Sequence, residues 1–328
     1  MNQSISSIAE KKISILEKRI LKAKVSKKLD LSDLSLTSIP TEVLDLTHIE
    51  SIALTNNLGL ILGNELAKFS NLRFLKIDYL GLTKVPEIVT QISSLESLDI
   101  SGNCISELPE TFSNLKNLKR FKLYNCDFEV FPKVLYQLEK LEDLNLAFQE
   151  KQNAIHINQA LRNLKKLNLN ANYGSTVSVK LPKLIVLNLD NCGLKSFESI
   201  CIHKKLKSVS IRLNKNLNFI PNQIVELQKL QAIHFYLSDD FQGIDKLNEL
   251  PKLKRIHVQF LSTNPKKLKD ILKIISFTDL YLEGSFENRK LWKKILKKPN
   301  LEVLYRISNY YDEKINIQRA RNEIGIKI

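Results

Sequence analysis

Apolar residues recur along most of the chain with a period of about 23 residues. Blocks that begin at residues 49, 72, 95, 118, 141, 164, 184, 206, 230, 253 and 277 each carry apolar residues at their first, fourth and sixth positions. All 33 of these positions are apolar, whereas the 43% apolar composition predicts about 14. Self-similarity at a fixed period indicates a solenoid, in which successive coils stack and share one core.

The ninth position of the blocks is a second, independent signal. A buried turn leaves backbone groups unpaired, and an Asn side chain can pair both a donor and an acceptor there. Each group left unpaired would cost about 1–3 kcal/mol. The ninth position holds Asn or Cys in six blocks: Asn57, Asn103, Cys126, Asn172, Cys192 and Asn214.

Together these positions read L-x-x-L-x-L-x-x-(N/C)-x-L, so the chain resembles leucine-rich-repeat proteins. The run Leu29-Asp30-Leu31-Ser32, followed by Leu36-Thr37-Ser38-Ile39-Pro40, resembles bacterial members, in particular the repeat part of Roc–COR GTPases. The resemblance implies an α/β solenoid, a horseshoe of about 12 repeats of 20–24 residues. A parallel sheet would line its concave face, and short turns, then helices, its convex face. No GxxxxGK[ST] phosphate loop occurs, so the GTPase part is absent.

Three segments are expected. Residues 1–25 contain apolar residues at 4-3-4-3 spacing, which predicts an amphipathic helix that caps the first coil or, alternatively, lies on a membrane surface. Residues 26–308 form the repeats, and 309–328 form a C-terminal cap or tail. An apolar–Pro step that starts an outer turn recurs at Pro40, Pro86, Pro109, Pro132 and Pro221. Helices are predicted from Pro265 to Ile275 and from Arg289 to Lys298.

The net charge of +15 belongs mostly to the two ends. Residues 10–28 and 262–300 each carry a surplus of six positive charges, which leaves the repeats between them nearly neutral. The second position alternates in sign over six blocks, from Glu50 to Lys165, which predicts a ladder of ion pairs between neighbouring coils.

Function is expected on the inner sheet. The fifth, seventh and eighth positions of the last coils combine rings, one Arg and apolar groups, as interaction hot spots do. The predicted partner-binding residues are Arg212, His234, Tyr236, His257, Gln259, Phe260, Tyr281 and Tyr305. The alternative is that such residues simply suit strands and pack under the next turn. A secondary cluster is predicted at Phe74, Tyr79, Lys122 and Tyr124. Two stacked histidines also predict pH-sensitive binding near neutral pH.

Other classes of function find little support in the sequence. There is no cofactor motif, GxSxG, HExxH or paired-carboxylate motif, and His234 and His257 lack a convincing ligand set, so we expect neither an enzyme nor a metal site. The four cysteines form no cluster, which indicates reduced thiols in a cytoplasm. The N-terminus has no apolar signal-peptide core, and no stretch is long and apolar enough to cross a membrane.

The leading hypothesis is therefore a cytoplasmic, monomeric recognition or adaptor module for one acidic or mixed-charge protein partner. Nucleic-acid binding through the basic ends is the alternative of another class, and steep salt dependence would reveal it. A secreted effector or a toxin-immunity protein would have the same sequence features.

Overall fold

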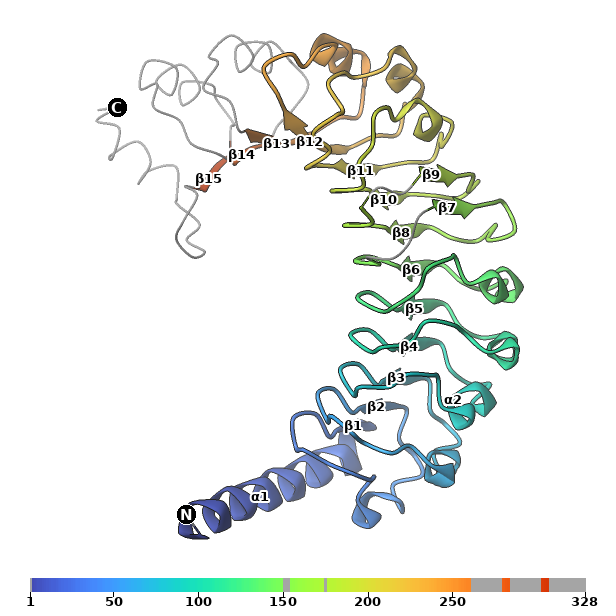
Figure 1. The fold of residues 1–328 in the computed structure, drawn as a ribbon, viewed down its shortest axis with the longest axis vertical. Helices are drawn as coiled ribbons and strands as arrows, with labels where there is room; N and C mark the ends of the chain where they lie inside the picture. The colour runs from blue at the N-terminus through green and yellow to red at the C-terminus, as the bar shows by residue number, and fades with distance from the viewer. Residues whose placement is uncertain (1, 150–153, 174–175, 261–278, 284–301, 307–328) are drawn as a thin grey trace. The chain divides into compact units, whose positions relative to one another are not determined.

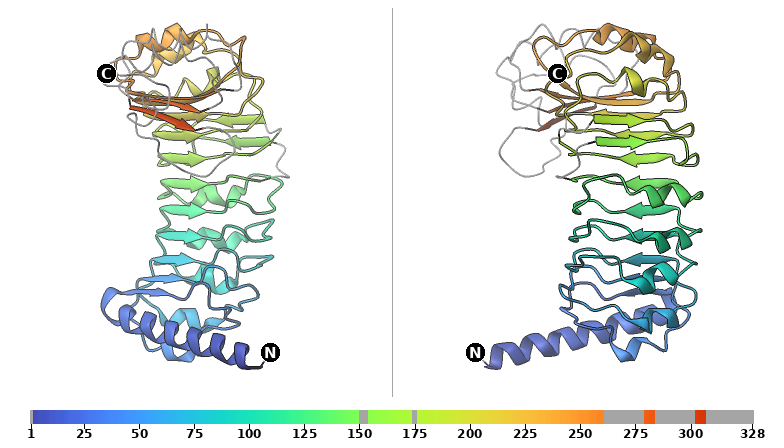
Figure 2. Two further views of the ribbon diagram at one scale, coloured as in Figure 1. Left: turned by 90° about the vertical axis from the view of Figure 1, so that its left-hand side faces the viewer. Right: turned by 45° about the vertical axis from the view of Figure 1, so that its right-hand side comes forward.

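Stacked coils, each with a short strand on one side and a short helical turn on the other, make up most of the chain (Figures 1 and 2). The computed structural model describes residues 2–149, 154–173, 176–260, 279–283 and 302–306. These residues divide into two compact units: Met1–Gln152 with Gln159–Leu164, and Asn153–Asn158 with Lys165–Ile328.

The first unit begins with a helix and continues as a run of parallel strands. Its elements are α1 (Asn2–Ser26), β1 (Lys28–Asp30), η1 (Thr41–Val43), β2 (Ser51–Ala53), η2 (Asn64–Lys68), β3 (Phe74–Lys76), α2 (Glu87–Gln91), β4 (Ser97–Asp99), η3 (Glu110–Asn114), β5 (Arg120–Lys122), η4 (Lys133–Gln137) and β6 (Asp143–Asn145). Strands pair in chain order without register shift, so that Leu75 aligns with Ile52 and with Leu98. The predicted period is therefore the period of the coils.

The second unit repeats this arrangement. Its elements are β7 (Ala154–Ile157), β8 (Lys166–Asn168), β9 (Thr176–Val179), β10 (Val186–Asn188), η5 (Glu198–Ile200), β11 (Ser208–Ile211), η6 (Asn222–Glu226), β12 (Ala232–Leu237), η7 (Ile244–Glu249), β13 (Arg255–Phe260), β14 (Asp279–Glu283) and β15 (Glu302–Arg306). The main sheet runs β8, β10, β11, β12, β13, β14, β15, all parallel.

A small second sheet, formed by β7 and β9, was not predicted. The two strands pair in parallel, with Ile155 aligned with Val177 and Ile157 with Val179. The coil of β7 has no proline, and in the coil of β9 the Leu181-Pro182 step comes only after the strand, whereas five other coils place Pro directly before a helical turn. Alternating β-branched residues occur in place of that turn, and such residues favour a strand.

The prolines of the apolar–Pro steps start the outer turns, as predicted. Each of the five lies immediately before a short helix: η1, α2, η3, η4 and η6. Their φ angles lie between −59° and −69°, the range that the pyrrolidine ring imposes. The helices predicted from Pro265 and from Arg289 lie outside the described residues.

The repeated leucines and the ninth-position Asn residues form the core. In the first unit, Asn57 donates to the carbonyls of Leu31 and Leu54 at 2.9 and 2.8 Å, and accepts from the amides of Leu34 and Leu36. Asn103 and Asn214 make the same four bonds in their own coils. Each Asn thereby joins one coil to the coil before it.

Helix α1 packs against the first coil through its C-terminal half. Ala23 is fully buried, and the Arg19 guanidinium donates to the Ser32 carbonyl at 2.6 Å. Further along the predicted apolar face, however, Ile13 is 58% exposed. The helix therefore covers the first coil only in part.

Candidate functional site

The strand face is the side of each sheet that the third, fifth and seventh positions share, because alternate residues of a strand point to opposite sides. On this face of the second unit, Arg212 is held by a buried carboxylate of the preceding coil. Asp190 is only 3% exposed, and its Oδ2 accepts from Arg212 Nε at 2.9 Å and from Nη2 at 2.8 Å. Its Oδ1 accepts from the Ser210 hydroxyl and from the Arg212 backbone N–H. Charge-assisted bonds of this kind fix the guanidinium in one orientation.

Beside Arg212 stand the two histidines of the predicted site. His234 and His257 align in register on β12 and β13, and their ring centroids lie 5.3 Å apart. The pKa of each imidazole is lowered to about 4, mainly by burial and in smaller part by the nearby charge of Arg212, against an opposite effect of Asp190. Both rings are therefore neutral at physiological pH. In the free protein the rings therefore do not change charge near neutral pH, and the expected pH-sensitive binding of a partner stays a prediction.

Two further predicted residues lie next to this pair. Tyr236 is 8% exposed, and burial raises the pKa of its phenol. Its side chain is therefore mostly packed inside the protein and offers little surface to a partner. Gln259 aligns with Tyr236 in register and is half-buried on the strand face. Of the neighbouring eighth positions, Leu237 is fully buried under the following turn, whereas Leu213 is 40% exposed.

The remaining predicted residues are described only through their backbones. Phe260 and Tyr281 lie in β13 and β14, and Tyr281 aligns with His257. Tyr305, by contrast, aligns with Leu282, and Leu304 aligns with Tyr281. The predicted last coil was thus displaced by one residue, and in a strand one residue separates the two faces. Tyr305 does not occupy the register position of the histidines.

In the first unit, two residues of the secondary cluster meet above a glycine. The hydroxyls of Tyr79 and Tyr124 lie 3.1 Å apart, although their coils are separated by the coil of Gly102. A Cβ atom at Gly102 would lie 2.4 Å from the Tyr79 ring. The ring therefore rests on the glycine. The hydrogen bond with Tyr79 raises the pKa of Tyr124, so the Tyr124 phenol stays protonated.

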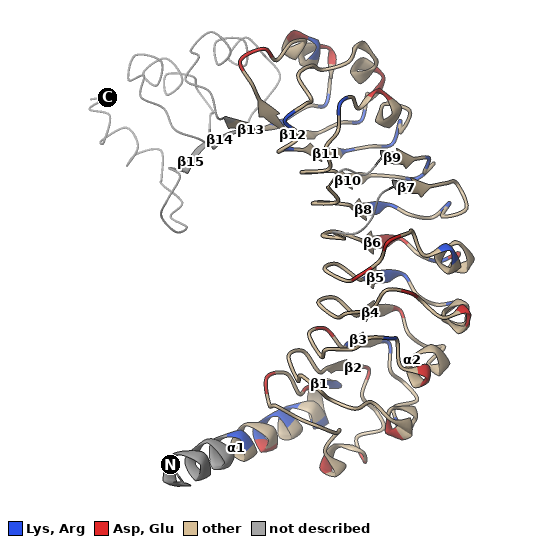
Figure 3. Ribbon diagram, in the orientation of Figure 1, with Lys and Arg blue, Asp and Glu red and all other residues tan. Residues whose placement is uncertain are grey.

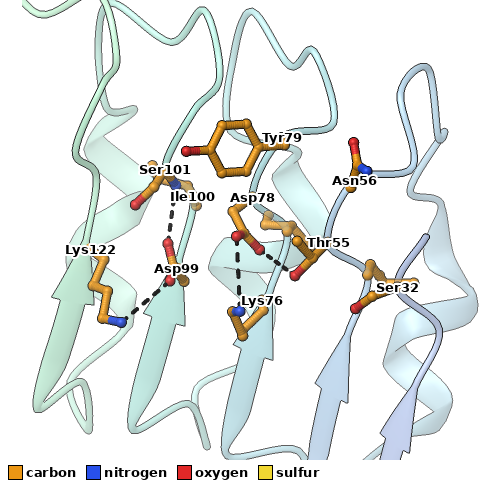
Figure 4. A network of polar contacts seen from close by, with 12 residues as sticks. Ser32, Thr55, Asn56, Lys76, Asp78, Tyr79, Asp99, Ile100, Ser101 and Lys122 are labelled. Carbon is orange, nitrogen blue, oxygen red and sulfur yellow. Dashed lines mark hydrogen bonds and ion pairs between the residues drawn. The ribbon is translucent and has the colours of Figure 1, made fainter. Parts of the chain in front are cut away.

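Two largely buried carboxylates lie side by side below Tyr79 (Figure 4). Asp78 accepts from the Thr55 hydroxyl at 2.6 Å and has Lys76 Nζ at 3.9 Å. Asp99 accepts from the Ser101 amide at 3.2 Å and has Lys122 Nζ at 3.7 Å. Lys122, a predicted site residue, thus neutralises the charge of a neighbouring coil.

Phe74, the fourth residue of the secondary cluster, lies elsewhere on the same face. The guanidinium carbons of Arg73 and Arg120 lie 5.4 and 5.5 Å from its ring centroid, within the range of cation–π attraction. The structure therefore pairs Tyr79 with Tyr124, places Lys122 against Asp99 and gives Phe74 a separate setting. Tyr79, Tyr124 and Lys122 therefore belong to one cluster, and Phe74 lies apart from them between Arg73 and Arg120.

The predicted charge ladder is present from Glu50 to Lys119 and starts one coil earlier than predicted, at Lys27. Glu50 lies 2.8 Å from Lys27 and 3.5 Å from Arg73, and Glu96 lies 2.7 Å from Arg73 and 3.0 Å from Lys119. These cations lower the pKa of Glu50 and Glu96 through hydrogen bonds and charge. The alternation of sign can be followed along the strand starts in Figure 3. Because these ion pairs are exposed, each contributes little to stability. Their main effect is to disfavour strand pairings that are shifted in register.

Two recurring features of the strand face escaped the sequence analysis. At the fifth position, an Asp or Asn side chain accepts the backbone N–H two residues later in five coils: Asp30, Asp99, Asn145, Asn168 and Asn188. At the eighth position, the backbone is left-handed from Asp33 to Leu213. Only Gly102 is a glycine there, so the usual sequence signal of this conformation is absent.

The chemistry of the remaining described residues is sparse. All four cysteines are free, and burial raises the pKa of the thiols of Cys126 and Cys192 to about 11 and about 12. Within the described ranges, no group of three or more His, Cys, Asp or Glu residues could hold a metal ion. Nor does any helix among the described residues have the length and apolarity needed to cross a membrane.

Comparison with known proteins identifies the repeats. A family model described as "Leucine-rich repeat region" matches residues 42–212, just over half of the 328 residues. No curated protein sequence matches.

Solved structures share the fold at low sequence identity. A leucine-rich-repeat protein of Leptospira interrogans is 24% identical, with a TM-score of 0.61 over 90% of this chain and 81% of its own. An internalin of Listeria monocytogenes is 14% identical, with a TM-score of 0.56 over 93% and 95%. TLR13 in a complex with ssRNA13 is 18% identical, with a TM-score of 0.60 over 92% of this chain and 48% of TLR13.

Proposed function

Since this chain belongs to the leucine-rich-repeat family, we propose that it is a protein-recognition module whose partner docks on the strand face of the second unit. The proposal rests on one observation: Arg212 is fixed by the buried Asp190 beside the two neutral imidazoles of His234 and His257. Polar groups that are already oriented and partly desolvated lose little entropy and little hydration on binding. Such groups become the centre of an interface.

The role is binding without catalysis. The buried thiols of Cys126 and Cys192 stay protonated because burial raises their pKa, and a protonated thiol is a poor nucleophile. The hydroxyl that aligns with His234, that of Ser210, donates to Asp190, so the imidazole does not activate it as a nucleophile. Unpaired thiols further support a reducing compartment for the protein, with export as an effector as the alternative.

Capture from a lysate of the source organism tests the proposal. The test variant D190N/R212Q/H234Q/H257Q removes the arginine together with its buried carboxylate and so leaves no unpaired buried charge. The control variant Y79F/Y124F removes two hydroxyls from the strand face of the first unit and keeps both rings. We expect the wild type and the control to retain the same protein partner, and the test variant to lose it. Equal retention by the test variant would refute the placement on the second unit.

A further inference from the structure

A row of five uncharged polar side chains crosses the second unit at the fifth position of its coils. In register, Asn168 aligns with Asn188, Asn188 with Ser210, Ser210 with His234, and His234 with His257. All five are half-buried, and they come from consecutive strands of the main sheet. We call Asn168, Asn188, Ser210, His234 and His257 the polar row.

The hydrogen bonds inside the protein orient this row. Asn168 Oδ1 accepts from the Asn170 amide at 3.0 Å, and Asn188 Oδ1 accepts from the Asp190 amide at 2.9 Å. Their Nδ2 groups make no hydrogen bond to any residue that the structure describes. Each Asn therefore presents two N–H donors on the strand face. Ser210 donates to Asp190, so its oxygen remains as an acceptor.

The row suits an extended polypeptide lying across the strands. Five parallel strands at about 4.8 Å spacing give a row about 19 Å long. An extended chain rises about 3.3–3.6 Å per residue, so roughly six residues match this length. The outward Asn donors can bind peptide carbonyls, whereas the Ser210 oxygen and one nitrogen of the neutral His234 imidazole can accept peptide N–H groups.

The charges around the row favour an acidic segment. At the third, fifth and seventh positions of β8, β10, β11, β12 and β13, the basic residues are Lys166, Arg212 and Arg255, and the one acid is Asp190. Asp190 is 3% exposed and is already bound by Arg212, so at these positions of β8 to β13 no acid is accessible, whereas the next strand, β14, places Asp279 opposite Arg255 and Glu283 opposite Gln259 in register. The strand face of the first unit differs, because it carries Asp30, Asp78, Asp99 and Asp143.

We propose that the polar row, together with Arg212, binds an extended segment of about six residues of a protein partner that is rich in Asp and Glu. The proposal rests on the proposed function and specifies the chemistry of the partner. Arg212 is oriented through Nε and Nη2, so its Nη1 is directed to a partner carboxylate beside the imidazoles. An RNA strand would also be negative. It is the less suitable ligand, because Tyr236 beside the row is only 8% exposed and the His234 and His257 rings are half-buried, which leaves little aromatic surface for stacking bases.

The coils themselves provide a conservative test variant. In the double variant N168D/N188D, two outward donors become carboxylates. The fold is expected to survive, because Asp30 and Asp99 make the same bond to the backbone at 3.0 and 3.2 Å. The matched control N145D changes an Asn with the same backbone bond on β6 of the first unit.

A random 12-residue peptide library displayed on phage is selected on the wild-type protein, and the enriched peptides are titrated on each variant by fluorescence anisotropy. We expect enrichment of Asp and Glu, at least tenfold weaker binding to N168D/N188D, and unchanged binding to N145D. Circular dichroism and urea midpoints verify that both variants are folded.

Three outcomes would overturn the inference: no enrichment of acidic residues, equal binding to wild type and N168D/N188D, or selective binding of fluorescent oligouridylate in place of any peptide. The proposed function fails separately. If N168D/N188D binds peptide like the wild type while the D190N/R212Q/H234Q/H257Q variant loses the captured partner, the partner docks on this face without following the polar row.

Discussion

The histidine pair should make the stability of the protein depend on pH in a window that the structure defines. His234 and His257 have a pKa of about 4 when folded, against 6.5 for an unperturbed imidazole. Between pH 4 and 6.5 the unfolded chain therefore binds more protons at these two sites than the folded protein. The stabilisation by the neutral rings is complete above pH 6.5 and is lost as the pH falls toward 4.

The magnitude follows from the size of the shift. One pKa unit corresponds to about 1.4 kcal/mol, so each ring contributes about 3 kcal/mol over the full window, and about 2 kcal/mol of this is lost between pH 7 and pH 5. Because both rings are partly exposed, solvent screens part of this effect. We expect the pair together to account for a loss of about 2–4 kcal/mol between these pH values.

Urea unfolding followed by circular dichroism at pH 7 and at pH 5 measures this loss. The wild type should lose more stability on acidification than the H234Q/H257Q variant, by the amount given above. The H48Q variant, which removes a histidine of the first unit, controls for the loss of a histidine as such. If the wild type and H234Q/H257Q lose the same stability on acidification, the pair is not held neutral by burial.

Three further predictions concern the framework. N103A should destabilise the protein by about 3 kcal/mol in urea unfolding, because it leaves the carbonyls of Ile77 and Ile100 without their donor, whereas N222A, at an exposed position of η6, should be nearly neutral. R212Q should cost about 3 kcal/mol by leaving Asp190 buried and unpaired, and D190N/R212Q should recover most of it; an additive double variant would show that the two residues are not coupled. G102A should push the Tyr79 ring away, cost about 1–2 kcal/mol, and return the pKa of Tyr124 toward its usual value in a phenol absorbance titration; an unchanged titration would contradict the contact.

The fold could be predicted because its signal is repeated in every coil. Leucines at three fixed positions and Asn at a fourth specify strand, core and turn together, so a local irregularity in one coil does not mislead the whole. The β7 and β9 pair was not predicted, because its sequence pattern is not repeated along the chain. It occurs in two coils only, and its alternation of small and β-branched residues is short.

The candidate site could be predicted only in part. The alignment of His234 with His257 follows from the period, but the pKa of each ring depends on its burial and on the charges of Arg212 and Asp190, which the period does not describe. The position of Tyr305 was wrong because the repeat is irregular near the end of the chain. The predicted strand was shifted by one residue, so that Leu304, and not Tyr305, aligns with Tyr281. The sequence does not indicate that Asn168 and Asn188 present N–H donors on the strand face. Their orientation depends on a hydrogen bond from a backbone amide to the side-chain oxygen, which is seen only in the structure.

The resemblance to the repeat part of Roc–COR proteins stays a prediction. The family match and the structural neighbours support a leucine-rich-repeat protein of the kind found in bacteria such as Leptospira and Listeria, at the level of fold.

Site-specific photo-crosslinking tests the central claim, that a partner docks on the strand face of the second unit. A photoreactive phenylalanine analogue is placed at Gln259, on the strand face beside Tyr236, or at Gln228, in the exposed turn after η6. The account predicts a partner adduct from position 259 and none from position 228. Adducts from position 228 alone would contradict it.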